Sequence, residues 1–144
     1  MRARRATAAD WPEVAALRTR VFVEEQGVPA DVERDEHDAT AVHALVRDER
    51  GRVVATGRLL VRDGRAVVGR MAVDTAVRGR GYGAAVLAEL HRQAVLLGLT
   101  EVELHAQVPA RGFYERAGYT AVGDVYEEAG IAHVTMRRPL ADEV

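Results

Sequence analysis

A glycine-rich loop between a predicted strand and a predicted helix constrains this chain more than any other segment. The loop reads Arg78-Gly79-Arg80-Gly81-Tyr82-Gly83 and follows a strand-like segment at 65–74. A helix is predicted directly after it, because apolar residues recur at spacings of three and four up to Leu97. Glycine amides at a helix N-terminus can point at one centre, where the helix dipole adds positive charge. The loop therefore predicts a pyrophosphate site.

Two other kinds of phosphate-binding loop are excluded. A Walker loop requires lysine followed by serine or threonine, and the chain contains neither lysine nor serine. A Rossmann fingerprint requires Gly-x-Gly-x-x-Gly early in a parallel βαβ unit. Here the glycines are spaced Gly-x-Gly-x-Gly, in the middle of the chain. The strands predicted before them, at 41–47, 52–62 and 65–74, are joined by short turns and so are expected to be antiparallel.

The remaining pattern predicts an α/β fold of the α+β type, with residues 1–144 as one domain. Asp10 is expected to cap the N-terminus of a first helix that ends near Gly27. Gly98 is expected to end the long helix after the loop. The other predicted elements are a strand at 2–6, acidic turns at 30–39, a strand at 101–107, a short helix at 109–117, and strands near 119–126 and 131–138.

Composition removes several classes of chemistry. The chain has no cysteine, and all 20 of its basic residues are arginine, so cysteine, serine and lysine nucleophiles are excluded. The net charge of −2 gives no electrostatic reason to expect a nucleic acid partner. Five scattered histidines form no metal-binding motif, so no metal is expected. No apolar run suits a membrane span or a signal peptide, so we expect a cytoplasmic protein without a membrane partner.

The loop and several further segments resemble the GNAT superfamily of acetyltransferases, and its ElaA-type branch in particular. The loop matches the superfamily pattern Gln/Arg-x-x-Gly-x-Gly/Ala. The run from Phe113 to Tyr119 matches Phe-Tyr-x-x-x-Gly-Phe/Tyr. The resemblance to the ElaA-type branch rests on residues 21–26, 69–73, 106–107 and 125–133. Together these segments extend over nearly the whole chain.

This resemblance implies a GNAT fold, with a mixed, mostly antiparallel sheet of six to seven strands flanked by about four helices. It also implies acetyl-CoA as co-substrate, with the pantetheine in a gap where the sheet is splayed between strands 67–74 and 101–107. Gln107 occupies a position where many superfamily members carry asparagine. The residues implied to bind the co-substrate are Met71, Val73, Arg78, Gly79, Arg80, Gly81, Tyr82, Gly83, Ala84 and Gln107.

The activity implied is transfer of an acetyl group to a primary amine by direct attack in a ternary complex. Tyr114 matches the family position that protonates the leaving thiolate. An amine acceptor must also lose a proton before it attacks, so a general base is needed. Glu25 and His133 are placed first, because both lie in branch-specific segments outside the cofactor motif. The other candidates are His43, His105 and Glu128.

Several alternatives stay open at this stage. The chain could instead be a CoA-binding sensor or a catalytically degenerate module, although Tyr114 and the intact loop favour an enzyme. The acceptor is a small-molecule or peptide amine that the sequence does not identify. The acidic residues at 31–38 either attract a cationic amine or form a solvated loop, and Arg70 either faces the substrate or pairs with an acid of that segment. A homodimer is the family-level expectation.

Overall fold

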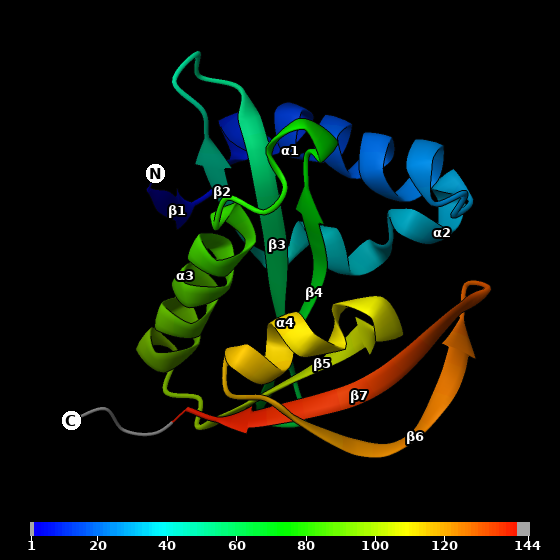
Figure 1. Cartoon of the computed structure of the whole chain (residues 1–144). Coiled ribbons are helices and arrows are strands. Elements are labelled where there is room, and N and C mark those ends of the chain that lie inside the picture. The colour runs from blue at the N-terminus through cyan, green and yellow to red at the C-terminus, as the bar shows by residue number, and fades with distance from the viewer. Residues whose placement is uncertain (1, 141–144) are drawn as a thin grey trace.

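A seven-stranded mixed sheet organises residues 2–140, the part of the chain that the computed structural model describes (Figure 1). The strand order is β1-β2-β3-β4-β5-β7-β6. All neighbours are antiparallel except β4 and β5, which are parallel. The strands are β1 (Ala3–Arg5), β2 (Val42–Arg47), β3 (Val53–Arg62), β4 (Arg65–Val73), β5 (Glu101–Gln107), β6 (Thr120–Glu128) and β7 (Ile131–Pro139). The predicted mixed sheet is confirmed.

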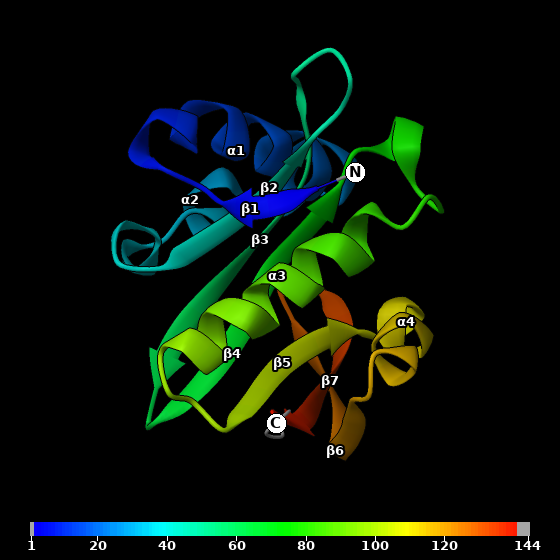
Figure 2. The same ribbon diagram turned by 90° about the vertical axis from the view of Figure 1, so that its left-hand side faces the viewer.

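Helices cover both faces of this sheet, with α1 on one face and α3 on the other (Figure 2). The α-helices are α1 (Trp11–Arg18), α2 (Ala30–Glu33), α3 (Tyr82–Leu96) and α4 (Arg111–Arg116). The short 3₁₀ segments are η1 (Ala8–Asp10), η3 (Glu36–Ala39), η4 (Thr75–Val77) and η5 (Val108–Ala110). The segment η2 (Thr19–Glu25) is a π-helix that continues from α1. The helix predicted after the loop is α3, and Gly98 follows it at a φ of 78°.

Two differences from the prediction concern the N-terminal helix. Asp10 precedes α1 at its N-cap position, as expected, but it lies in η1 with helical backbone angles and its side chain caps no N–H of α1. Its carboxylate instead accepts the backbone N–H of Thr7 at 2.8 Å, so the helical region begins three residues earlier. The second difference is η2, because a regular α-helix was expected up to Gly27. Apolar spacing alone does not distinguish a π-turn from an α-turn.

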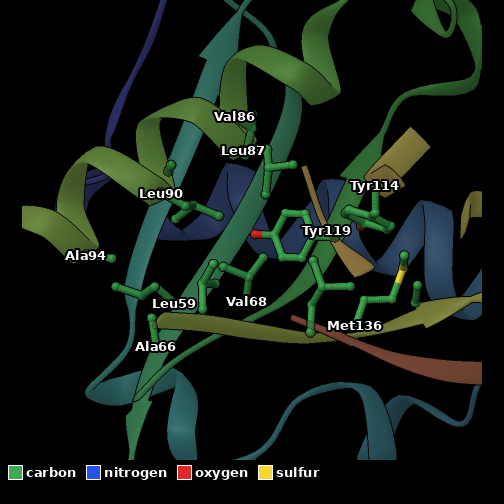
Figure 3. Close-up of a cluster of buried hydrophobic side chains, with 14 of the residues drawn as sticks. Leu59, Ala66, Val68, Val86, Leu87, Leu90, Ala94, Tyr114, Tyr119 and Met136 are labelled. Atoms are coloured by element: carbon green, nitrogen blue, oxygen red, sulfur yellow. The ribbon is translucent and has the colours of Figure 1, made fainter. Parts of the chain in front are cut away.

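The main core lies between α3 and the sheet (Figure 3). Val86 and Leu90 of α3 are fully buried, and they pack with Leu59 of β3 and Val68 of β4 in one cluster. A second cluster on the opposite face joins α1 and η2 to the sheet through Val14, Leu17, Val21 and Phe22. The two clusters fix α3 and η2 on opposite sides of β4.

A bulge and a separation of strands distinguish β4 from the rest of the sheet. Thr56 of β3 pairs with Ala72 and Arg58 pairs with Gly69, so one extra β4 residue bulges between these pairs. Arg70 lies in the bulge with a φ of 51°, a conformation that L-residues rarely adopt. Beyond Val68 and Leu104, β4 and β5 no longer pair. The splay predicted for the sheet is confirmed at this place.

Buried ion pairs hold Arg70 and the acidic segment together. We call Arg18, Arg58, Arg70, Glu33, Asp35 and Asp38 the arginine–acid cluster. Arg18 donates to Glu33 at 2.7 Å and to Asp38 at 2.8 Å, and the side chains of Arg18 and Glu33 are 1% and 2% exposed. Arg58 donates to Asp35 at 2.7 Å and to Asp38 at 2.8 Å.

Arg70 completes the arginine–acid cluster through its Nε, which donates to the Glu33 carbonyl at 2.9 Å, and its Nη2, which lies 3.3 Å from Asp35. Of the two alternatives for Arg70, the ion pair is the one observed. The acidic segment is divided. Asp31 and Glu36 are exposed to solvent, whereas Glu33, Asp35 and Asp38 are paired with arginines on three other elements.

We predict that Gly57→Ala destabilises the fold, because Gly57 faces the bulge and the α3 core. A Cβ at this position would lie 2.5 Å from the Met71 sulfur and 2.9 Å from a Leu90 methyl carbon. Overpacking of this kind costs about 1–3 kcal/mol in the free energy of unfolding. Gly69→Ala on β4 is the matched control, because nothing lies within 4 Å of its Cβ position. Urea unfolding would contradict the prediction if the two variants were equally stable.

A second prediction concerns stability and pH. Hydrogen bonding from Arg58 lowers the pKa of Asp35 from 3.8 to about 2. Because the folded-state pKa is depressed, Asp35 stabilises the fold above about pH 4, and this contribution disappears as pH falls toward about 2. Asp35→Asn should therefore cost about 1–2 kcal/mol at pH 7 and progressively less below pH 4. Urea unfolding over this range is the measurement. The exposed Asp31→Asn is the control, and a cost for Asp35→Asn that did not change with pH would contradict the assignment.

Candidate active site

A cleft of about 1000 Å³ opens where β4 and β5 separate. Residues from η2, β3, β4, β5, α3, α4 and β7 line it. Most of the residues predicted from the sequence to form the site are therefore close together. Those that line the cleft are Met71, Val73, Arg78, Gly79, Gly81, Tyr82, Gly83, Ala84, Gln107, Tyr114 and His133. Arg80 is exposed on the loop and is not among the lining residues.

The glycine loop presents backbone donors at one end of this cleft. Gly79 and Gly81 have φ values of 80° and 88°, which glycine adopts without a steric penalty. Gly81 is the N-cap of α3, and the first helical hydrogen bond is donated by Ala85 to the Gly81 carbonyl. Within residues 2–140, no backbone N–H from Arg78 to Ala84 has a hydrogen-bond acceptor. These N–H groups and the α3 dipole fit a pyrophosphate.

The unpaired part of β4 forms one wall of the cleft. Met71 and Val73 both line it, beyond the last residues of β4 that pair with β5. Strand backbone groups that lack a neighbouring strand need another partner, and the amides of a pantetheine chain can supply one. Phe113 of α4 lies close to the start of α3, because a Cβ on Gly83 would be 3.5 Å from its ring. The sequence analysis assigned Phe113 no role.

Arg78 and Glu25, which the sequence assigned to different tasks, are bonded to each other. Both Nη atoms of Arg78 donate to the Glu25 carboxylate at 2.7 Å, and its Nε donates to the Val73 carbonyl at 2.9 Å. Both side chains are about 40% exposed. Hydrogen bonding from Arg78 lowers the pKa of Glu25. A carboxylate with a lowered pKa is a weaker base, so this contact makes Glu25 a poorer proton acceptor.

A second bridge links η2 to the far wall of the cleft. The Gln107 side-chain amide at the end of β5 donates to the Gln26 side chain at 2.9 Å. Gln107 thus lies in the cleft, as predicted, but its amide is already engaged by Gln26. Gln26 belongs to the segment 21–26 that carries part of the family resemblance, yet it was given no role. Only that resemblance could have drawn attention to it.

Tyr114 lies on α4 and is 8% exposed. Burial raises the pKa of its phenol to about 12. The hydroxyl is protonated at neutral pH, as a tyrosine with the ordinary pKa would also be, and it carries a proton that it can donate. Within residues 2–140 it donates to no acceptor, although its ring packs against Phe113 and Tyr119 at centroid distances of 5.0 and 5.8 Å. Packing fixes the ring, and Tyr114 is one of the residues that line the cleft.

The candidate bases are divided between two places. His133 lies on β7 opposite Gln107, and its Nδ1 lies 2.7 Å from the Ile131 carbonyl oxygen. This carbonyl can only accept, so Nδ1 carries a proton, and in the neutral imidazole the lone pair is then on Nε2. His105 and Glu128 also line the cleft, with His105 Nδ1 3.7 Å from Glu128. His43 is elsewhere, with its ring tilted against that of Trp11 and its Nε2 3.0 Å from the Asp38 carbonyl oxygen.

Two structural features are absent from residues 2–140. No helix in this range is long and apolar enough to span a membrane. The same residues contain no group of three or more histidine, aspartate or glutamate side chains arranged to hold a metal ion.

Comparison with known proteins places this geometry in a family. The family model for an acetyltransferase (GNAT) domain matches residues 7–140. Over 123 residues the chain is 33% identical to YjcF of Bacillus subtilis, described as an uncharacterized N-acetyltransferase, covering 85% of this chain and 87% of that protein.

Comparison with solved structures leads to the same family. An acyl-CoA N-acyltransferase from Pseudomonas aeruginosa superposes with a TM-score of 0.82 at 33% identity, covering 94% of this chain and 97% of that one. Escherichia coli ElaA superposes with a TM-score of 0.82 at 28% identity and the same coverage. The chain therefore belongs to the GNAT family of acetyltransferases and is an acyltransferase with ElaA among its structural relatives.

Proposed function

We propose that the protein transfers the acetyl group of acetyl-CoA to a primary amine by direct attack within a ternary complex. The observation that carries the proposal is the set of N–H groups from Arg78 to Ala84, which face no protein acceptor within residues 2–140 and lie beside the gap between β4 and β5. A loop of this kind suits a pyrophosphate, and the adjoining strand edge suits an amide-bearing arm. Both features occur together in CoA.

The residues proposed to hold acetyl-CoA divide into two groups. The loop amides from Gly79 to Ala84 bind the pyrophosphate, and the backbone of Met71 and Val73 binds the pantetheine. Bound acetyl-CoA supplies the activated acetyl group. Arg78 is proposed to add charge beside the loop, which requires its guanidinium to leave Glu25. That step is inexpensive, because a half-exposed ion pair is worth only about 1 kcal/mol or less.

Tyr114 is proposed as the general acid. Its phenol is protonated at neutral pH, as a phenol of ordinary pKa near 10 already is, and burial raises the pKa further to about 12. A thiolate leaving group is a stronger base than the solvent, so a nearby phenol can donate a proton to it as it departs. The rigid packing of the Tyr114 ring against Phe113 and Tyr119 keeps this donor in one position.

His133 is proposed as the general base in preference to Glu25. The Nδ1–H of His133 is held by the Ile131 carbonyl, which leaves Nε2 free to accept a proton from the acceptor amine, directly or through water. Glu25 is bound at both oxygens by Arg78, and its pKa is lowered. We therefore assign Glu25 to positioning Arg78 and the η2 segment. The amine is proposed to approach from the side of the sheet that η2 covers, where His133 and His105 line the cleft.

A substitution in the glycine loop tests whether the loop binds acetyl-CoA. Gly81→Val should weaken acetyl-CoA binding by about tenfold or more, because a side chain at a φ of 88° forces the loop to change and disperses its N–H groups. Gly51→Val is the matched control, since Gly51 has a φ of 81° in the β2–β3 turn, away from the cleft. Calorimetry gives the affinities, and circular dichroism checks the fold. Equal affinity in both variants would contradict the loop assignment.

A substitution of Tyr114 tests whether its phenol is the general acid. Tyr114→Phe should lower the turnover number by about 10²–10⁴-fold with acetyl-CoA affinity unchanged, because only the proton donor is lost. CoA release with a panel of primary amines can be followed with a thiol reagent without background from the protein, because the chain has no cysteine. Tyr82→Phe removes another phenol from the cleft and is the control. Loss of affinity in place of turnover would show that Tyr114 binds the co-substrate and is not the acid.

A further inference from the structure

The β6–β7 hairpin places a carboxylate on the same face of the sheet as the proposed base. Its two-residue turn, Ala129-Gly130, has φ values of 54° and 77°, as tight hairpins require, and this turn fixes the register of the two strands. Tyr126 pairs with His133, and their rings stack at a centroid distance of 6.1 Å. Glu128 lies two residues beyond Tyr126 and therefore on the same face. Both Glu128 and His133 line the cleft, and Figure 1 shows the tip of the hairpin on the same side of the molecule as α2.

The Glu128 side chain reaches across β7 toward β5. Its Oε1 lies 3.7 Å from Nδ1 of His105 on β5, and β7 is the strand between β5 and β6. The carboxylate therefore lies over the strand that carries His133. His105 is the only charged or titratable cation within 4.0 Å of it among residues 2–140, at a separation longer than a hydrogen bond. The Glu128 side chain is 49% exposed, so its carboxylate can accept a hydrogen bond from a ligand.

The acids of this hairpin lack the arginine partners that acids of the neighbouring strand have. The chain contains no arginine or lysine from residue 117 to residue 136. Within residues 2–140, no arginine nitrogen lies within 4.0 Å of the carboxylates of Asp124, Glu127 and Glu128. Glu103 of β5, by contrast, accepts from Arg137 at 2.9 Å. The hairpin side of the cleft is therefore negatively charged.

The buried histidine of β7 supplies a second group that a ligand can satisfy. His133 is only 7% exposed, and it lines the cleft. Its Nδ1 is engaged by the Ile131 carbonyl, whereas its Nε2 has no partner within residues 2–140. An unpartnered ring nitrogen and an unpaired carboxylate, that of Glu128, thus lie on adjacent strands and on one face. A molecule with a reacting amine at the first and a cation at the second satisfies both groups.

Arg62 of β3 does not compensate these acids. It also lines the cleft, and it has no carboxylate within 4.0 Å among residues 2–140. The strand pairing, however, places Arg62 level with Glu101 at the start of β5, whereas His133 pairs with Gln107 at its end. The length of β5, about 20 Å, separates the two places. The charge closest to the proposed base is therefore acidic.

Resting on the proposed function, we propose that the acceptor is a diamine or polyamine, whose second ammonium group binds Glu128 while its first amine reacts beside His133. An alkyl ammonium has a pKa of about 10.4, so the second group stays charged at neutral pH. The first nitrogen, once neutral, attacks the thioester carbon and gives a proton to His133 as the carbon–sulfur bond breaks. CoA leaves as the thiol with the proton of Tyr114, and the second nitrogen keeps its proton and its contact with Glu128.

Three acceptors with the same number of carbons test the charge requirement on the full chain. Butylamine, diaminobutane and γ-aminobutyrate are neutral, cationic and anionic at the end that does not react. The wild type should show a kcat/KM for diaminobutane about tenfold or more above that for butylamine, which exceeds the factor of two expected from having two amines. γ-Aminobutyrate should be the poorest acceptor, because the hairpin acids repel its carboxylate. CoA release, followed with a thiol reagent, gives the rates.

Two variants of the hairpin separate direct contact from general attraction. Glu128→Gln should lower the ratio of kcat/KM for diaminobutane to kcat/KM for butylamine by about fivefold or more. Glu127→Gln is the matched control, because it removes the same charge from the neighbouring position. Glu127 pairs with Ala132, so alternation places its side chain on the opposite face of β6, and the ratio should stay intact. Circular dichroism checks that both variants fold.

The outcomes separate this proposal from the function on which it rests. A wild type that acetylates butylamine or γ-aminobutyrate as well as diaminobutane would overturn the diamine site while leaving the acetyltransferase in place. A Glu128→Gln variant that loses activity equally with both amines would also overturn it, because Glu128 would then act on the reacting nitrogen. An equal fall of the ratio in both variants would reduce the effect to general attraction by charge. A wild type that bound no acetyl-CoA in calorimetry would remove the proposed function as well.

Discussion

The arginine–acid cluster is the constraint on which the open sheet depends. A strand that bulges and then leaves its neighbour loses ladder hydrogen bonds, and a non-glycine residue at a φ of 51° is unfavourable as well. Arg70 occupies that position and is held by the Glu33 carbonyl and the Asp35 carboxylate. Three arginines and three acids compensate one another, which offsets the cost of removing the charges from water. The positions of the cleft, the loop and the start of α3 depend on the direction that β4 takes after the bulge.

The site combines rigid and adjustable parts. Tyr114 is fixed by aromatic packing, and His133 is fixed by a backbone carbonyl. The contacts across the mouth of the cleft are weaker, since both Glu25 and Arg78 are about 40% exposed. Ligand entry can therefore disturb the η2 contacts at a small cost, whereas the groups proposed for proton transfer keep their positions. The difference between the rigid and the adjustable groups follows from how deeply each side chain is buried, and it does not require a mobile domain.

Local signals explain what the sequence could predict. The strands followed from alternation and short turns, and the loop followed from glycines at a strand–helix junction. The splayed GNAT fold came from the family resemblance. Contacts between distant residues had no local signal, because Glu25 and Arg78 are 53 positions apart and Gln26 and Gln107 are 81 apart. The pairing of Glu33, Asp35 and Asp38 had no local signal for the same reason, since their arginine partners lie on α1, β3 and β4.

The contact between Arg78 and Glu25 connects the two halves of the site thermodynamically. A carboxylate whose pKa is lowered by one guanidinium regains its ordinary proton affinity when an anion draws that guanidinium away. If bound acetyl-CoA draws Arg78 away from Glu25, as proposed, then by reciprocity protonation of Glu25 strengthens anion binding at the loop by the same factor by which the anion strengthens proton binding at Glu25. Proton uptake at Glu25 and co-substrate uptake at the loop are then linked equilibria.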